Sequence, residues 1–139
     1  MTVTFCGHRK INNIETIANL LYIHIENLII NGACSFLTGG YGEFDELSAK
    51  IVKKLKQKYP HIKSTNIIPY INKKTNINLY DFIQYPYFEN VHPKYAIIKN
   101  NQYMVDNSDI VIAYIRRDSG GAFKTFSYAK RKHKHIILL

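Results

Sequence analysis

The chain of 139 residues has no tryptophan, two cysteines, four prolines and few acidic side chains. No apolar run approaches the about 18 residues that a membrane-spanning helix needs, and the first nine residues lack the charged start and apolar stretch of a secretory signal. Cys6 and Cys34 form no Cys-x-x-Cys pair and are too few for a disulfide framework, which is typical of the reducing cytoplasm. We therefore expect a cytoplasmic protein without membrane contact, in which both cysteines are buried strand residues.

The shortage of acidic residues leaves 10 Asp and Glu against 19 Lys and Arg, a formal net charge of +9. This balance favours anionic partners, which are nucleotides, nucleic acids or phosphorylated metabolites, without choosing among them. Hydrophobic residues make up 46% and charged residues 21% of the chain, an ordinary globular composition that excludes a disordered, collagen-like or coiled-coil protein. The length predicts a single domain over residues 1–139.

Short apolar runs alternate with longer segments of helical periodicity. The predicted strands are 3–6, 34–38, 64–68, 109–114 and 136–139, and the predicted helices are about 14–28, 45–59, 93–107 and 120–133. Continuous apolarity over 109–114 indicates a central strand covered on both faces. The order predicts an α/β fold, a Rossmann-like doubly wound sheet of about five mainly parallel strands with helices on both faces.

Two local signals mark the ends of the first predicted helix. Asn12 and Glu15 have the spacing of a capping box at its start. Gly32 lies where a C-terminal cap belongs.

Residues 70–92 interrupt the alternation with an aromatic-rich segment that has no clean period. A connection this long in a compact domain is usually functional or covers another part of the fold, so we expect a long excursion with at most a short helical turn. Its aromatic side chains either stack on a base or form a lid, for which Tyr80, Tyr85 and Tyr87 are the candidates, or they bury a sheet edge or a dimer seam.

Three loops, 6–10, 38–45 and 116–122, follow predicted strands and should meet at one edge of the sheet, where doubly wound folds bind ligands. Two of them carry a Gly-Gly pair before a helix, where backbone N–H groups can approach a phosphate and the helix N-terminus adds partial positive charge. Neither a Walker motif nor a Gly-x-Gly-x-x-Gly fingerprint is present. The candidate ligand-binding residues in these loops are Gly7, His8, Arg9, Thr38, Gly39, Gly40, Tyr41, Gly42, Asp45, Ser119, Gly120 and Gly121.

The loops belong to three motifs: strand–Gly-His-Arg, strand–Thr-Gly-Gly-x-Gly-x-Phe-Asp, and Met-x-x-x-Ser-Asp-x-x-x-Ala before a Gly-Gly loop. In this order they resemble the SLOG superfamily, which groups the DNA-uptake protein DprA with the Lonely Guy cytokinin-activating enzymes. The resemblance covers nearly the whole chain and is closest to small stand-alone members. It implies a nucleotide-derived ligand and, because SLOG proteins commonly pair through their helices, a homodimer.

The Lonely Guy enzymes are nucleoside-monophosphate phosphoribohydrolases with a catalytic Arg, a phosphate-binding Thr and a catalytic Glu. Here Asn100 occupies the position that matches the Arg, and Phe126 and Ser127 replace two consecutive glutamates. The resemblance makes Thr125 a counterpart, shifted by one residue, of the phosphate-binding Thr. It therefore supports binding of a nucleotide derivative and does not carry over that hydrolysis.

Glu43, Asp45, Glu46 and Asp118 lie in or beside the loops. Cleavage of an N-glycosidic bond needs a carboxylate near the oxocarbenium-like carbon, and Asp45 is the best catalytic candidate, with Glu43 second. Asp45 has two alternative roles, the N-cap of the second helix or a contact to a ribose hydroxyl, and Glu43 either contacts ligand or faces water. His8 is a general base, a structural residue or a hydrogen-bond partner of the ligand.

The densest basic run, 130–135, either interacts with the dipole at a helix C-terminus or binds nucleic acid. His133 and His135 have no Cys or acidic partner spaced for a standard zinc site, so we expect no metal and no cofactor. The most direct interpretation is a protein that senses or sequesters a small nucleotide-derived ligand at its glycine-rich loops. The alternatives are an enzyme that cleaves a nucleotide N-glycosidic bond and a single-stranded nucleic-acid binder.

Overall fold

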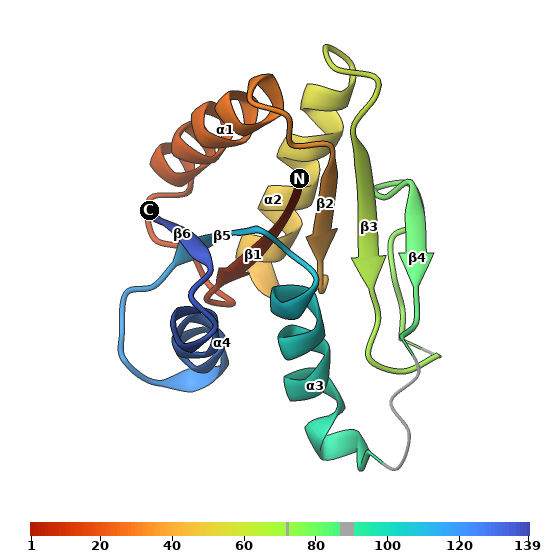
Figure 1. Cartoon of the computed structure of the whole chain (residues 1–139), viewed down its shortest axis with the longest axis vertical. Helices are drawn as coiled ribbons and strands as arrows, with labels where there is room; N and C mark the ends of the chain where they lie inside the picture. Colours follow the sequence, from red (N-terminus) through yellow and green to blue (C-terminus); the bar gives the residue numbers. More distant parts are fainter. Residues whose placement is uncertain (72, 87–90) are drawn as a thin grey trace.

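The computed structural model describes residues 1–71, 73–86 and 91–139, which form a three-layer α/β structure (Figure 1). Its sheet has six strands in the order β4-β3-β2-β1-β5-β6, and every neighbouring pair is parallel. The strands are β1 (Thr2–Gly7), β2 (Ser35–Thr38), β3 (Lys63–Ile67), β4 (Phe82–Gln84), β5 (Ile110–Tyr114) and β6 (His135–Leu138). This arrangement confirms the predicted Rossmann-like fold class.

Two helices cover each face of the sheet. α1 (Ile14–Ile30) and α2 (Gly42–Lys56) pack on one face, and α3 (Pro93–Asp106) and α4 (Gly120–Arg131) pack on the other. All five residues of β5 are buried, which confirms the prediction of a central covered strand. The chain moves outward from β1 through α1 to β2, and outward the other way from β5 through α4 to β6. The carboxyl ends of β1 and β5 therefore meet where the strand order reverses, the usual place for a ligand in such a sheet.

The sheet has one strand more than the about five that the sequence predicts. The additional strand, β4, lies inside the aromatic-rich segment 70–92 and pairs with β3 at the sheet edge. Its three residues are all exposed, so they carry no alternation of buried and exposed positions from which a strand could be recognised.

The two cap predictions for α1 had different outcomes. Gly32 has a φ of 107°, and its N–H and that of Ala33 donate to the carbonyls of Ile29 and Leu28, which is the pattern of a glycine C-terminal cap. The capping box was wrong because the N-cap is Asn13, in the left-handed conformation and without a side-chain cap. α2 also differs from the prediction, since it begins at Gly42, three residues before Asp45.

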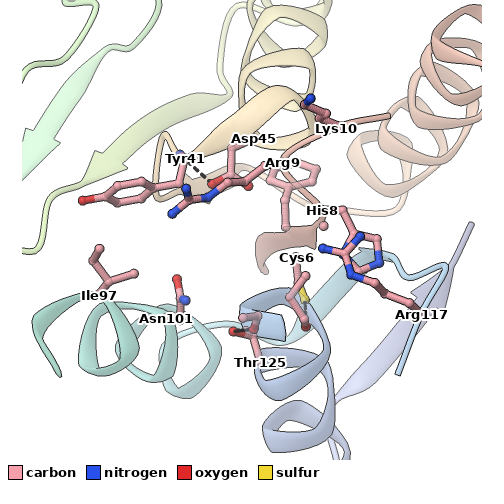
Figure 2. Close-up of a pocket in the computed structure, with 14 residues that line it drawn as sticks. Cys6, His8, Arg9, Lys10, Tyr41, Asp45, Ile97, Asn101, Arg117 and Thr125 are labelled. Carbon is pink, nitrogen blue, oxygen red and sulfur yellow. Dashed lines mark hydrogen bonds between the residues drawn. The ribbon is translucent and has the colours of Figure 1, made fainter. Parts of the chain in front are cut away.

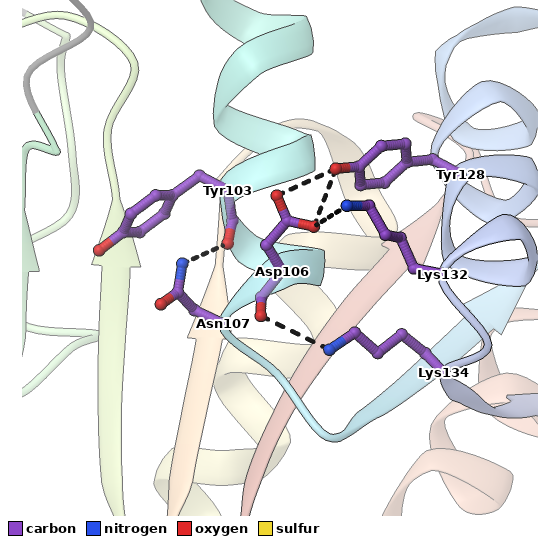
Figure 3. Close-up of polar contacts among 6 residues, drawn as sticks. All are labelled: Tyr103, Asp106, Asn107, Tyr128, Lys132 and Lys134. Atoms are coloured by element: carbon purple, nitrogen blue, oxygen red, sulfur yellow. Dashed lines mark hydrogen bonds and ion pairs between the residues drawn. The ribbon is translucent and has the colours of Figure 1, made fainter.

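The carboxyl ends of α3 and α4 are joined by a polar cluster around Asp106 (Figure 3). The hydroxyl of Tyr128 donates to both carboxylate oxygens of Asp106, at 2.8 and 2.9 Å. The ammonium of Lys132 lies 3.7 Å from the same carboxylate, and that of Lys134 donates to the backbone carbonyl at 3.5 Å. These contacts hold together the two helices that cover one face of the sheet.

We expect Tyr128→Phe to lower the free energy of unfolding by about 0.5–1 kcal/mol, because it removes the hydroxyl donor to a charged acceptor near the surface. Urea unfolding followed by circular dichroism measures the change. Lys132→Met is expected to have a smaller effect, since its ion pair is longer and half exposed. Equal midpoints for Tyr128→Phe and wild type would show that the hydroxyl contributes nothing.

Candidate functional site

A cavity of about 460 Å³ opens at the carboxyl ends of β1 and β5 (Figure 2). In Figure 2, Arg9, Tyr41 and Asp45 lie on one side of it, opposite Ile97 and Asn101 of α3. The lining residues are Phe5, Cys6, Gly7, His8, Arg9, Lys10, Tyr41, Asp45, Ile97, Asn101, Arg117, Gly121, Ala122 and Thr125. Its volume is within the range of about 300–1,000 Å³ that is usual for small-molecule sites.

The loop after β1 is held by backbone and side-chain bonds to its neighbours. The backbone N–H of Glu43, at the start of α2, donates to the carbonyl of Arg9 at 2.8 Å. The carboxylate of Glu43 accepts the N–H of Ile11 at 2.6 Å, and the hydroxyl of Tyr114 accepts the N–H of Asn12 at 3.2 Å. Glu43 therefore acts as an anchor for this loop, which places Arg9 and Lys10 at the cavity.

His8 is only 4% exposed and connects the first loop to the third. Its Nε2 accepts the backbone N–H of Arg116 at 2.9 Å, so this nitrogen is unprotonated and already bonded. Burial, together with the charges of Arg117 and Arg116, lowers the pKa of His8 from its usual 6.5. The neutral ring is thus fixed as an acceptor that positions the loop after β5, and only Nδ1 is left for a ligand.

Asp45 is 8% exposed and lines the cavity from the first turn of α2. Its Oδ2 accepts the backbone N–H of Tyr41, the N-cap residue, at 3.0 Å, so its side chain reaches back to the helix start although it is not itself the N-cap. Burial raises the pKa of Asp45 to about 7, against the opposing effects of this hydrogen bond and of the charge of Lys73. A carboxyl group that changes charge near neutral pH therefore faces the cavity.

The raised pKa of Asp45 makes stability depend on pH in a defined direction. Because the folded state holds this proton more tightly than the unfolded state, whose value is 3.8, its contribution to the free energy of unfolding is full below about pH 4 and is lost as the pH rises through about 7. We expect Asp45→Asn, which keeps an acceptor for Tyr41, to become progressively more stable relative to wild type between pH 4 and 8. Urea titrations at several pH values test this, and a difference that stays constant would contradict it.

Cations dominate the polar lining of the cavity. Arg9, Lys10 and Arg117 contribute three positive charges, and Asp45 is the only acidic residue among the described residues of the lining. Among the described residues, no carboxylate lies within ion-pair distance of these three cations. Arg116, by contrast, stacks on the ring of Tyr114 and donates to the carbonyl of Leu139, so its guanidinium has a structural role.

The N-terminus of α4 lines the first cavity through Gly121 and Ala122. Its N-cap, Ser119, makes no side-chain cap hydrogen bond, and Gly120 has a φ of 88°, a conformation that favours glycine. A Cβ at Gly121 would meet no atom within 4 Å, so a ligand has space to approach the backbone. Thr125 donates its hydroxyl to the carbonyl of Gly121 at 3.0 Å. The free N–H groups of this first turn and its dipole suit an anion.

The structure brings part of the predicted site together. The predicted residues that line the cavity are Gly7, His8, Arg9, Tyr41, Asp45, Gly121 and Thr125. Gly40 and Gly42 line a second cavity on the other side of the turn before α2. Thr38 is fully buried and donates to the hydroxyl of Tyr80, and Gly39 lies against Met104. The described lining of the first cavity does not include Thr38, Gly39, Ser119 or Gly120.

Sequence reasoning missed the lining residues contributed by α3, by the start of α4 and by side chains next to the motifs. They are Phe5, Cys6, Lys10, Ile97, Asn101, Arg117 and Ala122. Lys10 and Arg117 stand in loops that the motifs singled out, so their charge was a usable signal. Ile97 and Asn101 reach the cavity through the packing of α3 beside α4, for which the sequence carries no local signal.

Two of the other predicted candidates, the acidic Glu46 and the aromatic Tyr80, have local partners. Glu46 pairs with Lys50 at 3.0 Å on the surface of α2. Tyr80 is bonded to Thr38, and Tyr70 accepts the hydroxyl of Tyr41 at 3.3 Å, which supports a packing role for this part of the segment 70–92. Tyr87, a candidate for stacking, lies outside the described residues.

The two cysteines lie in different environments. Cys6 is buried and donates its thiol to the carbonyl of Ala122 at 3.0 Å, and burial raises its pKa to about 12, so it is a structural residue. The prediction of two buried strand cysteines was wrong for Cys34, which is exposed and precedes β2 by one residue. Within the described part of the chain, no group of three or more His, Cys, Asp or Glu side chains is placed to hold a metal ion.

The basic run 130–135 is partly engaged in the fold. Lys132 and Lys134 contact Asp106, and Lys130 and Arg131 lie over the rings of Phe126 and Tyr128. These contacts favour the structural interpretation of the run over a nucleic-acid surface.

The model of the YspA SLOG family matches residues 7–136. The chain belongs to this family. No curated protein sequence matches it. This membership confirms the resemblance that the three motifs carry.

Solved structures with a similar fold include two DprA proteins and a carrier protein. DprA from Streptococcus pneumoniae has a TM-score of 0.75 at 16% identity, covering 99% of this chain and 49% of that one. DprA from Helicobacter pylori, which binds single-stranded DNA, has a TM-score of 0.70 at 16% identity, covering 99% and 64%. The molybdenum cofactor carrier protein from Chlamydomonas reinhardtii has a TM-score of 0.63 at 15% identity, covering 99% and 74%. The SLOG chain thus spans less than two thirds of either DprA, and these identities show the fold alone.

At Asn100, where the Lonely Guy pattern has its catalytic Arg, this SLOG chain has a structural residue. Asn100 is fully buried, and its amide donates to the carbonyl of Ile67 at the end of β3, at 2.8 Å. It therefore fixes α3 to the sheet and does not line the cavity. Across the described part of the SLOG chain, no helix combines the length and apolar character needed to cross a bilayer.

Proposed function

We propose that the cavity at the ends of β1 and β5 binds a small nucleotide-derived ligand, which the protein senses or sequesters. The observation that carries the proposal is the convergence of Arg9, Lys10 and Arg117, none with a carboxylate partner among the described residues, on a cavity that the N-terminus of α4 also faces. Unpaired guanidinium groups and free backbone N–H groups together suit a phosphate.

The remaining lining suits the nucleoside part of such a ligand. Asp45 offers carboxylate oxygens to a ribose hydroxyl or a base amino group, and Asn101 offers an amide. Tyr41 and Ile97 provide an aromatic and an aliphatic surface for a base. The ligand phosphate then lies toward Gly121, and the nucleoside toward α3.

The test is isothermal titration calorimetry with AMP, ADP-ribose, NAD and cyclic dinucleotides, together with mass spectrometry of any small molecule released when the purified protein is denatured. The proposal predicts saturable binding of at least one nucleotide, recovered intact. Absence of binding across the panel and of any released nucleotide would contradict it. Affinity for oligonucleotides alone, falling steeply with salt, would favour the nucleic-acid alternative instead.

A second candidate function, cleavage of the N-glycosidic bond, rests on Asp45. Among the described lining residues it is the only one with a carboxyl group, and its pKa of about 7 is that of a group able to exchange a proton at neutral pH. Chromatography of AMP and ADP-ribose after incubation with the protein distinguishes the two functions. Release of free adenine that Asp45→Asn abolishes would establish an enzyme, and intact nucleotide supports sensing or sequestration.

The proposal also covers the assembly of the protein. We propose a homodimer, as the family resemblance implies, built from one domain over residues 1–139. Light scattering coupled to gel filtration measures the mass, and a monomer at all concentrations would contradict this part.

A further inference from the structure

A second cavity, of about 410 Å³, lies on the other side of the turn that precedes α2. The β1 loop, the turn 40–42, the end of β3 and the segment 73–80 enclose it. Arg9 lines both cavities. Tyr41 lines the first cavity, and its chain neighbours Gly40 and Gly42 line the second, so Arg9 and the turn at Tyr41 separate the two spaces.

The second cavity carries cations without carboxylate partners. Arg9, Lys73 and Lys74 line it, and among the described residues none of the three lies within ion-pair distance of a carboxylate. The ammonium of Lys73 lies 4.3 Å from the centre of the Tyr41 ring and makes only long contacts, of 3.4 and 3.5 Å, to the carbonyls of Lys74 and Gly40. These cations are therefore available to an anion.

The acidic residues of the second cavity are already bonded. Glu43 accepts the N–H of Ile11 at 2.6 Å, and Glu46 pairs with Lys50 at 3.0 Å. Both contacts draw the carboxylates toward partners that do not line this cavity, and the three cations Arg9, Lys73 and Lys74 outnumber the two carboxylates among the described lining residues.

Asn66 adds an acceptor that lacks a donor. Its side chain is 1% exposed and lines the second cavity from the end of β3. Its amide nitrogen donates to the hydroxyl of Thr75, while Oδ1 has no hydrogen-bond partner among the described residues. A Cβ at Gly40 would lie 3.3 Å from that oxygen, and the φ of Gly40 is 70°, so glycine keeps the approach to it open. A buried acceptor without a donor is unfavourable, and a ligand hydroxyl would satisfy it.

We propose that the second cavity binds the distal half of the same ligand, which is a nucleoside diphosphate derivative with a hydroxyl-bearing group beyond its second phosphoryl group. This inference rests on the proposed function, since the first phosphoryl group lies in the first cavity. Arg9 bridges the two phosphoryl groups, Lys73 and Lys74 bind the second one, and a distal hydroxyl donates to Oδ1 of Asn66. The segment 73–75 thus selects for ligands longer than a nucleoside monophosphate.

Calorimetry with AMP, ADP and ADP-ribose as probes tests this inference on wild type, Lys74→Gln and Lys10→Gln. We expect wild type to bind ADP-ribose at least about tenfold more tightly than AMP, since a charge-assisted contact contributes about that factor. Lys74→Gln should remove most of this advantage and leave AMP affinity unchanged. Lys10→Gln, in the first cavity only, should weaken AMP and ADP-ribose by similar factors.

The outcomes separate this inference from the function on which it rests. Binding of AMP with no gain for ADP-ribose, or a Lys74→Gln variant that keeps the wild-type ratio, would overturn the inference and leave the proposed function intact. Failure of wild type to bind any of the three nucleotides would overturn the inference, and it would overturn the proposed function as well when NAD, the cyclic dinucleotides and the search for released nucleotide are also negative. Lys73→Gln serves as a second variant in the second cavity. Because Lys73 also contacts Tyr41, circular dichroism is used to confirm that this variant folds.

Discussion

Replacing Gly7 by alanine is expected to lower the free energy of unfolding by about 1–3 kcal/mol, the range for inserting atoms into a close-packed core. Gly7 is the last residue of β1, and a Cβ there would lie 2.3 Å from two ring carbons of Phe44. Phe44 is fully buried and stacks on Tyr114 at 5.7 Å between ring centres, so its ring has no free space to move into. The strain therefore reaches the start of α2 and the end of β5.

Gly121→Ala is the matched control for Gly7→Ala. A Cβ at Gly121 meets nothing within 4 Å, and the residue lies in the first turn of α4, where alanine is the better helix former. We expect its stability to equal that of wild type or to exceed it slightly. Urea unfolding of both variants is the measurement, and equal midpoints for Gly7→Ala and wild type would contradict the packing argument.

Replacing Arg117 by alanine is expected to weaken AMP binding by about 10- to 100-fold, the loss that follows from removing hydrogen bonds between a guanidinium and a phosphate. Arg117 lines the first cavity beside the N-terminus of α4, and among the described residues no carboxylate neutralises it. Its side chain is exposed, so the variant should fold like wild type. Calorimetry with AMP measures the change.

The control for Arg117→Ala is Arg131→Ala, which removes the same charge at the last residue of α4, where the side chain lies over Tyr128 and does not line the first cavity. We expect AMP affinity to fall by less than about twofold, because an exposed charge at the far end of α4 from the phosphate is screened by salt. Similar losses in both variants would indicate a general electrostatic attraction in place of a phosphate site at α4.

Much of the fold was predictable because its signals are local. Alternation of apolar runs predicted the order of the elements, and the positive φ of Gly32 followed from the need for a residue that ends α1 in the left-handed region. The edge strand β4 was not predictable, because its three residues are all exposed and carry no alternation of buried and exposed positions. The start of the second helix was predicted at Asp45, three residues too late, because Gly42 and Glu43 look like loop residues, although the helix begins there.

The residues of the candidate site likewise fall into those with a local signal in the sequence and those without one. Gly7 ends β1, and Arg9 and Gly121 lie in the loops and helix start that follow β1 and β5, so parallel-strand geometry alone predicts that they gather. Asn101 and Lys73 reach the two cavities from segments that carry no motif, and only the packing of α3 and of the segment 73–80 brings them there. The role proposed for Asn66 depends on an acceptor that has no donor among the described residues, which cannot be read from a sequence.

The most direct test of the central claim is an NMR titration of the ¹⁵N-labelled protein with AMP. The account predicts saturable shifts of the backbone amide signals of Gly120, Gly121 and Ala122, at the N-terminus of α4, and of Arg9 in the loop after β1. Shifts confined to the basic run 130–135, or no shift at these four amides at saturating AMP, would contradict a nucleotide site at the ends of β1 and β5.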